Sequence, residues 1–437
     1  CITLDRVDES LYAEIAENTA QWQQWDDLGF KGKDEGWGTL DYLKQHQALM
    51  VDTSLFSLEF KAELLKRIDD LDAQTDGLII NSDNFQGINL LAEKYYSRLN
   101  SIYIDPPYNT DASAILYKNG FKKSSWATLM HNRVEKAKDL LNQTGIICLA
   151  IDDEQVSELR SIAEEFFIKQ IGVAPVRSNP AGRKTKGKFA PAHEYALFYA
   201  KSENTVPLSL DKSEKSLARY PKEDSKGRFS WANFIRSGNN DKREDRPKLY
   251  YPIFISDNDQ IRVPKMEWSD LEGQYVLLEQ PLPNETIVFP DVNKDGKIIQ
   301  KNWQRGNQRV GTELEEYRIR RDQDNKISID FKIRMDVTAL PITWWDKSTY
   351  ASSNYGALEL KNLFGEKSFD FAKAHDLVLD CLRTSGAKLE NSNILDFFAG
   401  SGTTAHATIA LNREDQGSRK YILVEQGEYF DTVIKPR

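Results

Sequence analysis

The strongest indication of the fold is the motif Asn393-Ile-Leu-Asp396-Phe-Phe-Ala-Gly400-Ser-Gly402-Thr-Thr404. Its apolar beginning predicts a strand, its two glycines predict a tight turn, and residues 403–411 predict a helix. Glycines allow the backbone to approach a ligand, and the first turn of a helix offers free N–H groups. No Lys follows the glycines, which excludes a Walker-type phosphate loop. The stretch therefore predicts a strand–turn–helix ligand site in an α/β sheet.

A second motif, Asp105-Pro-Pro-Tyr108, follows the apolar run 102–104. Proline fixes its own φ and pushes the preceding residue into extended geometry, so the motif predicts a rigid loop at the end of a strand. The Asp105 carboxylate and the Pro106 carbonyl can accept hydrogen bonds from an –NH2 group, and the Tyr108 ring can stack on a planar base. Acceptors placed where positive charge develops on nitrogen stabilise a transition state. We therefore predict a catalytic shelf formed by Asp105, Pro106, Pro107 and Tyr108.

Two ligands compete for the glycine motif. Gly400-x-Gly402-x-x-Ala405 satisfies the loose dinucleotide pattern, and Glu425 ends the next predicted strand, 421–424, where it could hold ribose hydroxyls. Alone, this pattern would favour a dehydrogenase. The pairing with Asp105-Pro-Pro-Tyr108 and the Phe-Phe-Ala lead-in favour S-adenosylmethionine instead, because a sulfonium prefers aromatic and carboxylate neighbours.

On these motifs the chain resembles the permuted (β-class) DNA amino-methyltransferases, and most closely the modification subunits of Type III restriction systems. The matching stretches are 103–110, 126–141, 145–152, 193–199, 250–253, 369–382 and 394–430. In that family Asp-Pro-Pro-Tyr usually accompanies methylation of adenine N6, whereas Ser at the first position is commoner for cytosine N4. The resemblance implies a site-specific adenine methyltransferase that flips its target base out of the duplex and serves a restriction-modification or other phage-defence system.

Cofactor binding is assigned to two sets of residues. The glycine motif and the following strand contribute Asp396, Phe398, Gly400, Ser401, Gly402, Thr403 and Glu425. The resemblance adds Asp83 near the cofactor adenine, and Phe371 and Lys373 at the start of a helix that lines the cofactor pocket. The family commonly has Lys-Pro at this point, whereas this chain has Lys373-Ala374. No metal is expected in the chemistry.

The predicted fold class is α/β, with a Rossmann-like methyltransferase sheet whose motifs occur in circularly permuted order. Strands at 78–80, 102–104 and 146–151 come first in the chain, and the two that end at Asp396 and Glu425 come last. Ligands of such sheets bind beyond the carboxyl ends of the strands, so the two halves can meet there. The helix at 126–141 has the 3–4 spacing of a core face.

The expected sections are an acidic helical section at 1–76, a catalytic half at 77–200, an inserted β-rich target-recognition domain at 201–340, and a cofactor-binding half at 341–437. The first section should contain one amphipathic helix over 55–71, packed on the catalytic domain or on a partner chain. In the insertion, hairpins are expected between 251–255 and 260–263, and between 286–289 and 297–300 around Asp295-Gly296.

The net charge of −9 is unevenly distributed along the chain. Residues 1–75 carry 16 acids and 7 bases, whereas residues 171–250 carry 17 bases and 9 acids. DNA binding depends on local neutralisation of phosphates, so the basic region is the predicted DNA-binding region. The candidate DNA-contacting residues are Arg183, Lys184, Lys186, Lys188, Arg236, Lys242, Arg243, Arg246, Arg305 and Arg309.

Composition bounds the remaining possibilities. The sequence has no run of eighteen apolar residues, and its three cysteines form no metal or redox motif, so a cytoplasmic protein without a membrane span is expected. Expected partners are double-stranded DNA, a second copy of the chain, and a restriction or other defence subunit. The chain begins with Cys and stops where relatives usually continue, so we expect a part of a longer polypeptide.

Three alternatives remain open. A cytosine-N4 methyltransferase would share the fold and most of the site. A methyltransferase for RNA or protein glutamine could use a similar shelf, although Asn at position 105 and a smaller insertion would be expected. A DNA-recognition subunit could retain the fold without activity, against which the intact Asp105, Tyr108 and both glycines argue.

Overall fold

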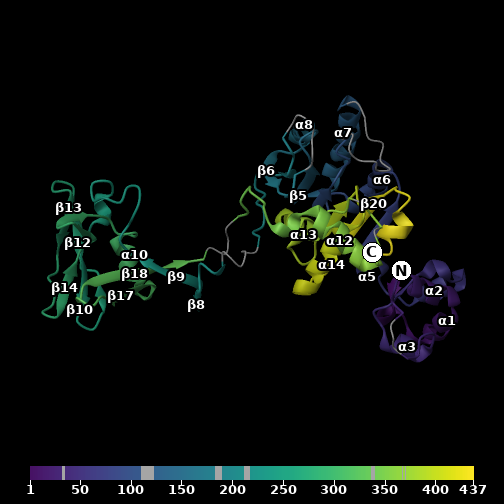
Figure 1. The fold of residues 1–437 in the computed structure, drawn as a ribbon, viewed down its shortest axis with the longest axis horizontal. Coiled ribbons are helices and arrows are strands. Elements are labelled where there is room, and N and C mark those ends of the chain that lie inside the picture. The colour runs from purple at the N-terminus through teal and green to yellow at the C-terminus, as the bar shows by residue number, and fades with distance from the viewer. Residues whose placement is uncertain are drawn as a thin grey trace. The chain divides into compact units, whose positions relative to one another are not determined.

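A computed structural model describes residues 1–31, 35–109, 123–182, 189–210, 217–335, 340–366, 368–369 and 371–437. The chain divides into two compact units, Cys1–Leu210 with Ala339–Arg437, and Asp211–Thr338 (Figure 1). The second unit falls within the segment expected to be inserted. Among the described residues, no helix is both long enough and apolar enough to cross a membrane.

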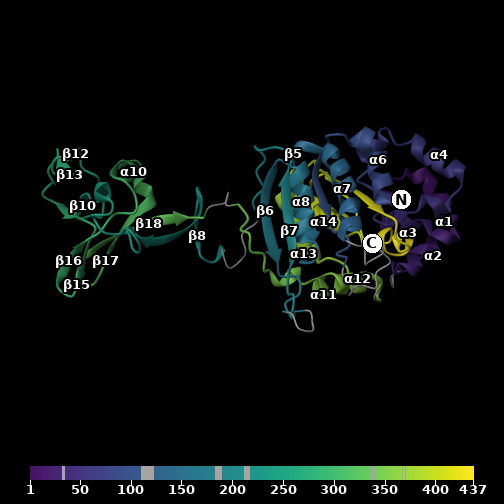
Figure 2. The same cartoon turned by 90° about the horizontal axis from the view of Figure 1, so that it is seen from above.

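A seven-stranded mixed sheet forms the centre of the first unit, in the order β3-β20-β19-β4-β5-β7-β6. Figure 2 shows β5, β7 and β6, at one end of this order, side by side. The strands from β3 to β5 in this order pair in parallel, and β7 runs antiparallel to both of its neighbours. The bounds are β3 Gly77–Asn81, β4 Leu99–Ile104, β5 Leu141–Ile151, β6 Lys169–Val176, β7 Glu194–Ala200, β19 Asn393–Asp396 and β20 Lys420–Glu425.

The two strands from the end of the sequence, β20 and β19, lie next to each other between β3 and β4, which come from its first part. Leu395 of β19 is paired with Ile102 of β4. Leu423 of β20 is paired with Ile79 of β3. Because these strands are parallel, their carboxyl ends share one edge of the sheet. The structure therefore brings the residues that follow β4 and those that follow β19 to the same edge, as expected for this α/β fold class.

Helices cover both faces of the sheet (Figure 1). On one face, Ile102 and Ile104 pack with Trp126, Met130 and the other buried residues of α6, α7 and α8. On the opposite face, Tyr103 packs with buried residues of α13 and α14. This alternation along β4 reflects the two-residue repeat of a strand whose two faces are both buried. The bounds are α6 Asn84–Tyr95, α7 Lys123–Leu140, α8 Val156–Phe166, α11 Ser352–Tyr355, α12 Ala357–Phe364, α13 His375–Leu382 and α14 Thr403–Asp415.

The acidic N-terminal section has its own aromatic core, which includes Trp22, Trp25 and Tyr42. The helix predicted over 55–71 is confirmed only in its middle, because α4 covers 58–66 and a second, separate helix begins at Leu71. Ser57 caps the first helix by accepting from Phe60 N, and Asp70 caps the second by accepting from Ala73 N. The elements of the N-terminal section are β1 Ile2–Thr3, α1 Tyr12–Glu17, α2 Thr19–Asp27, α3 Leu40–Gln45, β2 Met50–Val51, α4 Leu58–Lys66 and α5 Leu71–Gln74.

The N-terminal section contacts the sheet-containing part of the unit through polar groups. Lys435 Nζ lies 2.6 Å from Asp52 Oδ2, and Lys94 Nζ lies 2.5 Å from Asp72 Oδ1. The apolar residues Phe60 and Leu64 of α4 are buried in the section's own core. The helix therefore packs within the section rather than presenting its buried face elsewhere.

The second unit is built of antiparallel strands around a core that includes Phe234, Tyr251 and Trp303. Its sheets have the orders β17-β18-β9-β8 and β11-β10-β14, with β12-β13 and β15-β16 as separate pairs. The bounds are β8 Lys222–Asp224, β9 Gly227–Asn233, β10 Ile253–Ser256, β11 Ile261–Arg262, β12 Met266–Ser269, β13 Gln274–Leu277, β14 Glu285–Val288, β15 Asp291–Lys294, β16 Lys297–Gln300, α10 Asn307–Thr312, β17 Tyr317–Arg321 and β18 Ile327–Arg334.

One of the two expected hairpins is confirmed and the other is wrong. β10 and β11 form the first, whereas Lys297–Gln300 pairs with β15 and Glu285–Val288 pairs with β10. Pro290 has no N–H to donate and separates β14 from β15, so the strand before it is free to join another sheet. Asp295 and Gly296, with φ of 54° and 80°, then make the tight turn of the β15–β16 hairpin.

The remaining short helical segments connect these elements. They are η1 Leu4–Arg6, η2 Glu9–Leu11, η3 Thr53–Leu55, η4 Pro247–Leu249, η5 Leu314–Glu316, η6 Ser348–Tyr350, η7 Arg383–Ala387 and η8 Phe430–Ile434.

Candidate active site at the edge of the sheet

The Asp-Pro-Pro-Tyr shelf begins one residue after β4. Pro106 is buried, and the Asp105 side chain keeps 24% of its surface exposed. Trp126 of α7 donates from Nε1 to the Pro107 carbonyl at 2.8 Å, which fastens the loop to the helix beneath it. The sequence indicated only a core role for this Trp. A buried indole N–H needs an acceptor, so Trp126 serves packing and loop position together.

A buried lysine lies against the shelf. Lys373 Nζ is 3.2 Å from Asp105 Oδ1 and 2.7 Å from Glu194 Oε2. It also donates to the Tyr108 hydroxyl and lies 4.7 Å from the centre of the Tyr108 ring. Tyr108 in turn donates from its hydroxyl to Glu194 Oε2 at 3.1 Å. The structure thus places Lys373, expected to line a cofactor pocket, in direct contact with the shelf.

Burial and charge perturb the ionisation of these groups. Burial raises the pKa of Asp105; the Lys373 ammonium opposes this rise and the Glu194 carboxylate adds to it. Burial opposes the charge of Lys373, but Asp105 and Glu194 outweigh it and raise the pKa of this ammonium. Burial, followed by the nearby carboxylates, raises the pKa of Tyr108 well above its ordinary value. Tyr108 is therefore a neutral hydroxyl at neutral pH, and Lys373 is a cation.

The glycine motif forms a loop organised by two buried carboxylates. Asp396 accepts from Phe398 N at 3.0 Å and from Thr404 Oγ1 at 2.6 Å. Glu425 accepts from Gly400 N at 2.9 Å, and its other oxygen accepts at the same distance from the two amides that follow it. Gly400 and Gly402 adopt φ of 52° and 80°, a region that side chains with a Cβ rarely occupy.

Asp396 lacks a cationic partner among the described residues, although its side chain is only 2% exposed. Burial raises its pKa to about 7, with Asp105 and Glu425 adding to the rise and the bonds from Thr404 and Phe398 opposing it. A buried carboxylate is normally paired when it is ionised. The loop therefore offers a buried carboxyl group whose negative form a cationic ligand would stabilise.

Arg437 holds the same loop from the side. Its Nη1 lies 2.9 Å from Ser401 Oγ and 3.0 Å from Thr403 Oγ1, and its Nη2 lies 2.8 Å from Glu359 Oε2. Burial lowers the pKa of this guanidinium to about 10. Nothing in the local sequence pattern indicated this residue, because the contact depends on where the chain returns after β20.

Asp83 lies at the same edge of the sheet. It follows β3, whose Asn81 is paired with Glu425, and it caps α6 by accepting from Phe85 N at 2.9 Å. Arg133 of α7 donates from Nη2 to its other oxygen at 3.1 Å. The structure thus brings this expected cofactor residue to the carboxyl edge of β3 and gives it a cation that the sequence analysis did not identify.

The two aromatic residues near Lys373 differ in position. Phe371 is 52% exposed, whereas a Cβ added at Gly400 would lie 3.9 Å from the Phe369 ring. Phe369 also packs against Tyr429 with ring centres 4.9 Å apart. Phe369, two positions before the residue predicted from the resemblance, is thus an aromatic residue that lies beside Gly400.

The candidate DNA-contacting residues occupy several environments. Positions 183–188, with four of the ten candidates, lie outside the described residues. Lys242 and Arg246 are exposed, while Arg243 stacks 4.5 Å from the centre of the Tyr250 ring. Arg236 is partly buried, and its Nε has no hydrogen-bond partner among the described residues.

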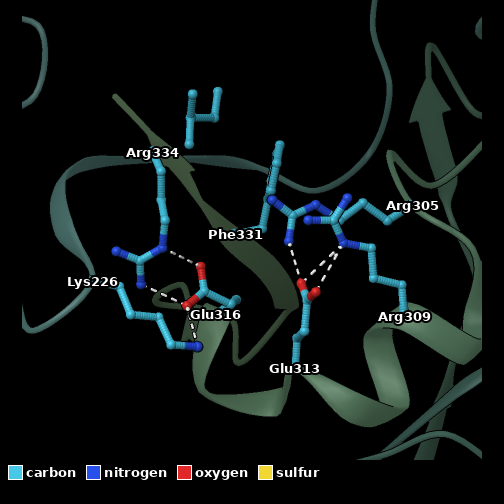
Figure 3. Close-up of a pocket in the computed structure, with 8 residues that line it drawn as sticks. Lys226, Arg305, Arg309, Glu313, Glu316, Phe331 and Arg334 are labelled. Atoms are coloured by element: carbon cyan, nitrogen blue, oxygen red, sulfur yellow. Dashed lines mark hydrogen bonds and ion pairs between the residues drawn. The ribbon is translucent and has the colours of Figure 1, made fainter. Parts of the chain in front are cut away.

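Arg305 and Arg309 line a pocket of about 570 Å³ within the second unit (Figure 3). Both guanidinium groups bond to Glu313, at 3.1 Å from Arg305 and 3.0 Å from Arg309 (Figure 3). Arg305 is 16% exposed and lies over the Phe331 ring, whereas Arg309 is 58% exposed. The Arg305 side chain thus mainly stabilises the second unit, and Arg309 is the cation of the two that is more accessible to solvent.

Residues 99–435 match the family model described as DNA methylase. The chain therefore belongs to this family, and the family expected from the motifs is confirmed. It is 29% identical over 395 residues to the Type III restriction-modification enzyme EcoPI Mod subunit of Escherichia phage P1, covering 82% of this chain and 58% of that one. It is 30% identical over 392 residues to the Type II methyltransferase M.KpnI of Klebsiella pneumoniae, covering 85% of each.

Among solved structures, the M1.HpyAVI–SAM complex matches with a TM-score of 0.38 and 13% identity, over 82% of this chain and 98% of that one. The chain spans little more than half the length of the Mod subunits that it resembles.

Proposed function

We propose that this protein transfers a methyl group from S-adenosylmethionine to the N6 amino group of an adenine in double-stranded DNA. The observation that carries the proposal is the meeting of the Asp105 shelf with the Asp396 glycine loop at one edge of the sheet, from segments far apart in the chain. Membership of the DNA methylase family supports DNA as the substrate.

The glycine loop fits S-adenosylmethionine by its charge and shape. Asp396 is a buried carboxylate without a cationic partner among the described residues, and it would complement the positive charge of the ligand. Gly400 and Gly402 let the backbone approach closely, and Asp83 and Glu425 lie at the same edge. When bound, S-adenosylmethionine supplies a methyl group activated by a positively charged sulfur.

The shelf residues would bind and orient the target base. The Asp105 carboxylate and the Pro106 carbonyl accept the two hydrogens of the amino group, which leaves the nitrogen lone pair free for bond formation. The Tyr108 ring stacks on the base, which offsets part of the few kcal/mol needed to flip it out of the duplex. Holding the reacting nitrogen in one orientation contributes much of the rate. Trp126 would contribute to this orientation, because its hydrogen bond to the Pro107 carbonyl holds the shelf in place.

DNA recognition is assigned to the second unit and to the basic residues around it. Its exposed cations Lys242, Arg246 and Arg309 can contact phosphates, which supply most of the salt-dependent affinity. Similarity to Mod subunits extends the proposal to a restriction-modification system, in which a partner chain would cleave unmodified DNA.

The test is methylation of duplex DNA with labelled S-adenosylmethionine, followed by digestion to nucleosides and mass analysis. N6-methyl-2′-deoxyadenosine is the expected product. Detection of N4-methyl-2′-deoxycytidine instead would show that the target base is cytosine. Asp105→Ala is expected to reduce transfer by at least about 100-fold while DNA binding changes little, because it removes a charged acceptor used in the transition state. Near-normal transfer by this variant would refute the role of the shelf, and absence of any product with wild-type protein would refute the proposal itself.

A further inference from the structure

Two carboxylates share one ammonium at the proposed amino-group acceptor, Asp105. The Lys373 ammonium lies between the Asp105 and Glu194 carboxylates, at 3.2 Å and 2.7 Å. The Lys373 and Glu194 side chains are 10% and 9% exposed. Glu194 is the first residue of β7 and Lys373 lies in the segment just before α13, so neither belongs to the Asp-Pro-Pro-Tyr motif.

Glu194 shows that this arrangement is more than an isolated ion pair. Its Oε2 is bonded to Lys373 and Tyr108, but its Oε1 is buried and has no hydrogen-bond partner among the described residues. An unsatisfied buried carboxylate oxygen disfavours folding and calls for a functional explanation. Glu194 therefore places an additional negative charge beside the shelf without satisfying all of its own bonding capacity.

The charged and titratable groups facing Asp105 can be named for each neighbouring element. Lys373 supplies the cation, and Glu194 supplies an anion from β7. Tyr103 of β4 and Tyr108 of the shelf supply hydroxyls, and Asp396 of β19 supplies a third carboxyl that interacts electrostatically with Asp105. Without the lysine, these acids would face one another in a site largely shielded from water.

We propose that Lys373 and Glu194 are positioning residues, in which the ammonium keeps the Asp105 carboxylate ionised and oriented while Glu194 holds the ammonium in place. This inference rests on the proposed methyl transfer. Protonated Asp105 would lack the negative charge that draws the hydrogens of the target amino group. Like charges at close range favour protonation of one carboxyl, and a nearby cation opposes it. Lys373 thereby sets the lower pH limit at which the shelf works.

The test compares the pH dependence of methyl transfer in Lys373→Met, Glu194→Gln, the double variant and wild type. Loss of the cation should move the acidic limb of the rate profile upward by about 1–3 pH units. Loss of the Glu194 charge should move it downward, and the double variant should lie between the two single variants. Lys373→Arg keeps the charge and should restore the limb toward its wild-type position.

Lys347→Met is the matched control, because Lys347 also pairs with a buried aspartate, with its Nζ 2.5 Å from Asp380 Oδ2. It should leave the acidic limb unchanged. An equal fall in rate at every pH for Lys373→Met, with no shift of the limb, would show a purely structural lysine and overturn the inference.

A second measurement separates this inference from the proposed function. Carbon-13 NMR of labelled aspartate carboxyls, with Asp105→Asn identifying the signal, follows the ionisation of Asp105 in protein without cofactor or DNA. Lys373→Met should shift this titration upward by about 1–3 units even if the substrate proves to be different. An unchanged titration would overturn the inference, whereas absence of methyl transfer by wild-type protein would overturn only the proposed function.

Discussion

Replacing Asp396 by Asn should make the protein more stable at alkaline pH, although it removes a charge from the proposed cofactor site. The Asp396 side chain is 2% exposed, and burial raises its pKa to about 7. In an unfolded chain the pKa of this carboxyl is about 3.9. Asn has nearly the same shape. Its amide oxygen can accept from Phe398 N and its NH2 group can donate to Thr404 Oγ1, so the main change is the loss of ionisation.

The magnitude follows from the difference between the two pKa values. A rise of roughly three units corresponds to about 4 kcal/mol between the two ionisation states. Because the folded-state pKa is the higher one, this stabilising contribution is fully present below about pH 4 and is lost as the pH rises through 7. Between pH 5 and pH 8, the wild type should therefore lose about 3 kcal/mol relative to Asp396→Asn.

Urea unfolding followed by circular dichroism at both pH values measures this difference. Asp52→Asn is the control of opposite sign: burial opposes ionisation of Asp52, but its hydrogen bonds from Lys435, Ser54 and Gln24 lower its pKa. That substitution should destabilise the protein at neutral pH, and the effect should fade as the pH falls. If Asp396→Asn and wild type show the same pH dependence, Asp396 ionises normally and the reasoning from burial fails.

Asp396→Asn should also bind S-adenosylmethionine more weakly than wild type, as measured by calorimetry. A protein that is more stable and yet binds less would show that the buried charge is retained for the ligand, as expected where function opposes stability. Unchanged affinity would place the ligand away from Asp396.

Three further predictions concern other parts of the chain. Gly402→Val should weaken S-adenosylmethionine binding about tenfold or more, because a β-branched residue at φ 80° is strained; Gly238→Val, at φ 97° in an exposed turn, should leave calorimetric affinity unchanged. Trp303→Ala should destabilise the second unit by about 3–5 kcal/mol in urea unfolding, since Trp303 is 1% exposed and stacks on Phe234, while the 59% exposed Trp344 should tolerate the change. Arg246→Ala should lower the slope of log affinity for DNA against log salt by about one, and an unaltered slope would remove Arg246 from the interface.

The central part of the fold could be predicted because each segment carries a strong local signal. The apolar runs before Asp105 and Asp396 are strands, and the helix beginning at Thr403 follows the glycines as expected. Each signal depends on a few neighbouring residues, such as the two prolines after Asp105 or the positive φ that favours Gly at 400 and 402.

Which strands pair with each other was harder to predict from the sequence. The strand Glu285–Val288 joins β10 instead of the segment expected as its partner, because alternating apolar residues define a strand without naming its neighbour. The helix predicted over 55–71 was too long for a related reason. Its apolar spacing continued across Ser57 and Asp70, whose capping bonds divide the segment.

Two local motifs were enough to predict the reactive groups: the rigid acceptor shelf at Asp105-Pro-Pro-Tyr108 and the glycine loop at Asp396. These depend on backbone restrictions that act over a few residues. The residues that surround the shelf depend on the three-dimensional fold. Lys373 and Glu194 lie 179 residues apart in the chain and meet at Asp105 through the order of strands in the sheet. Burial there makes each charge depend on the others, and no local pattern encodes such a dependence.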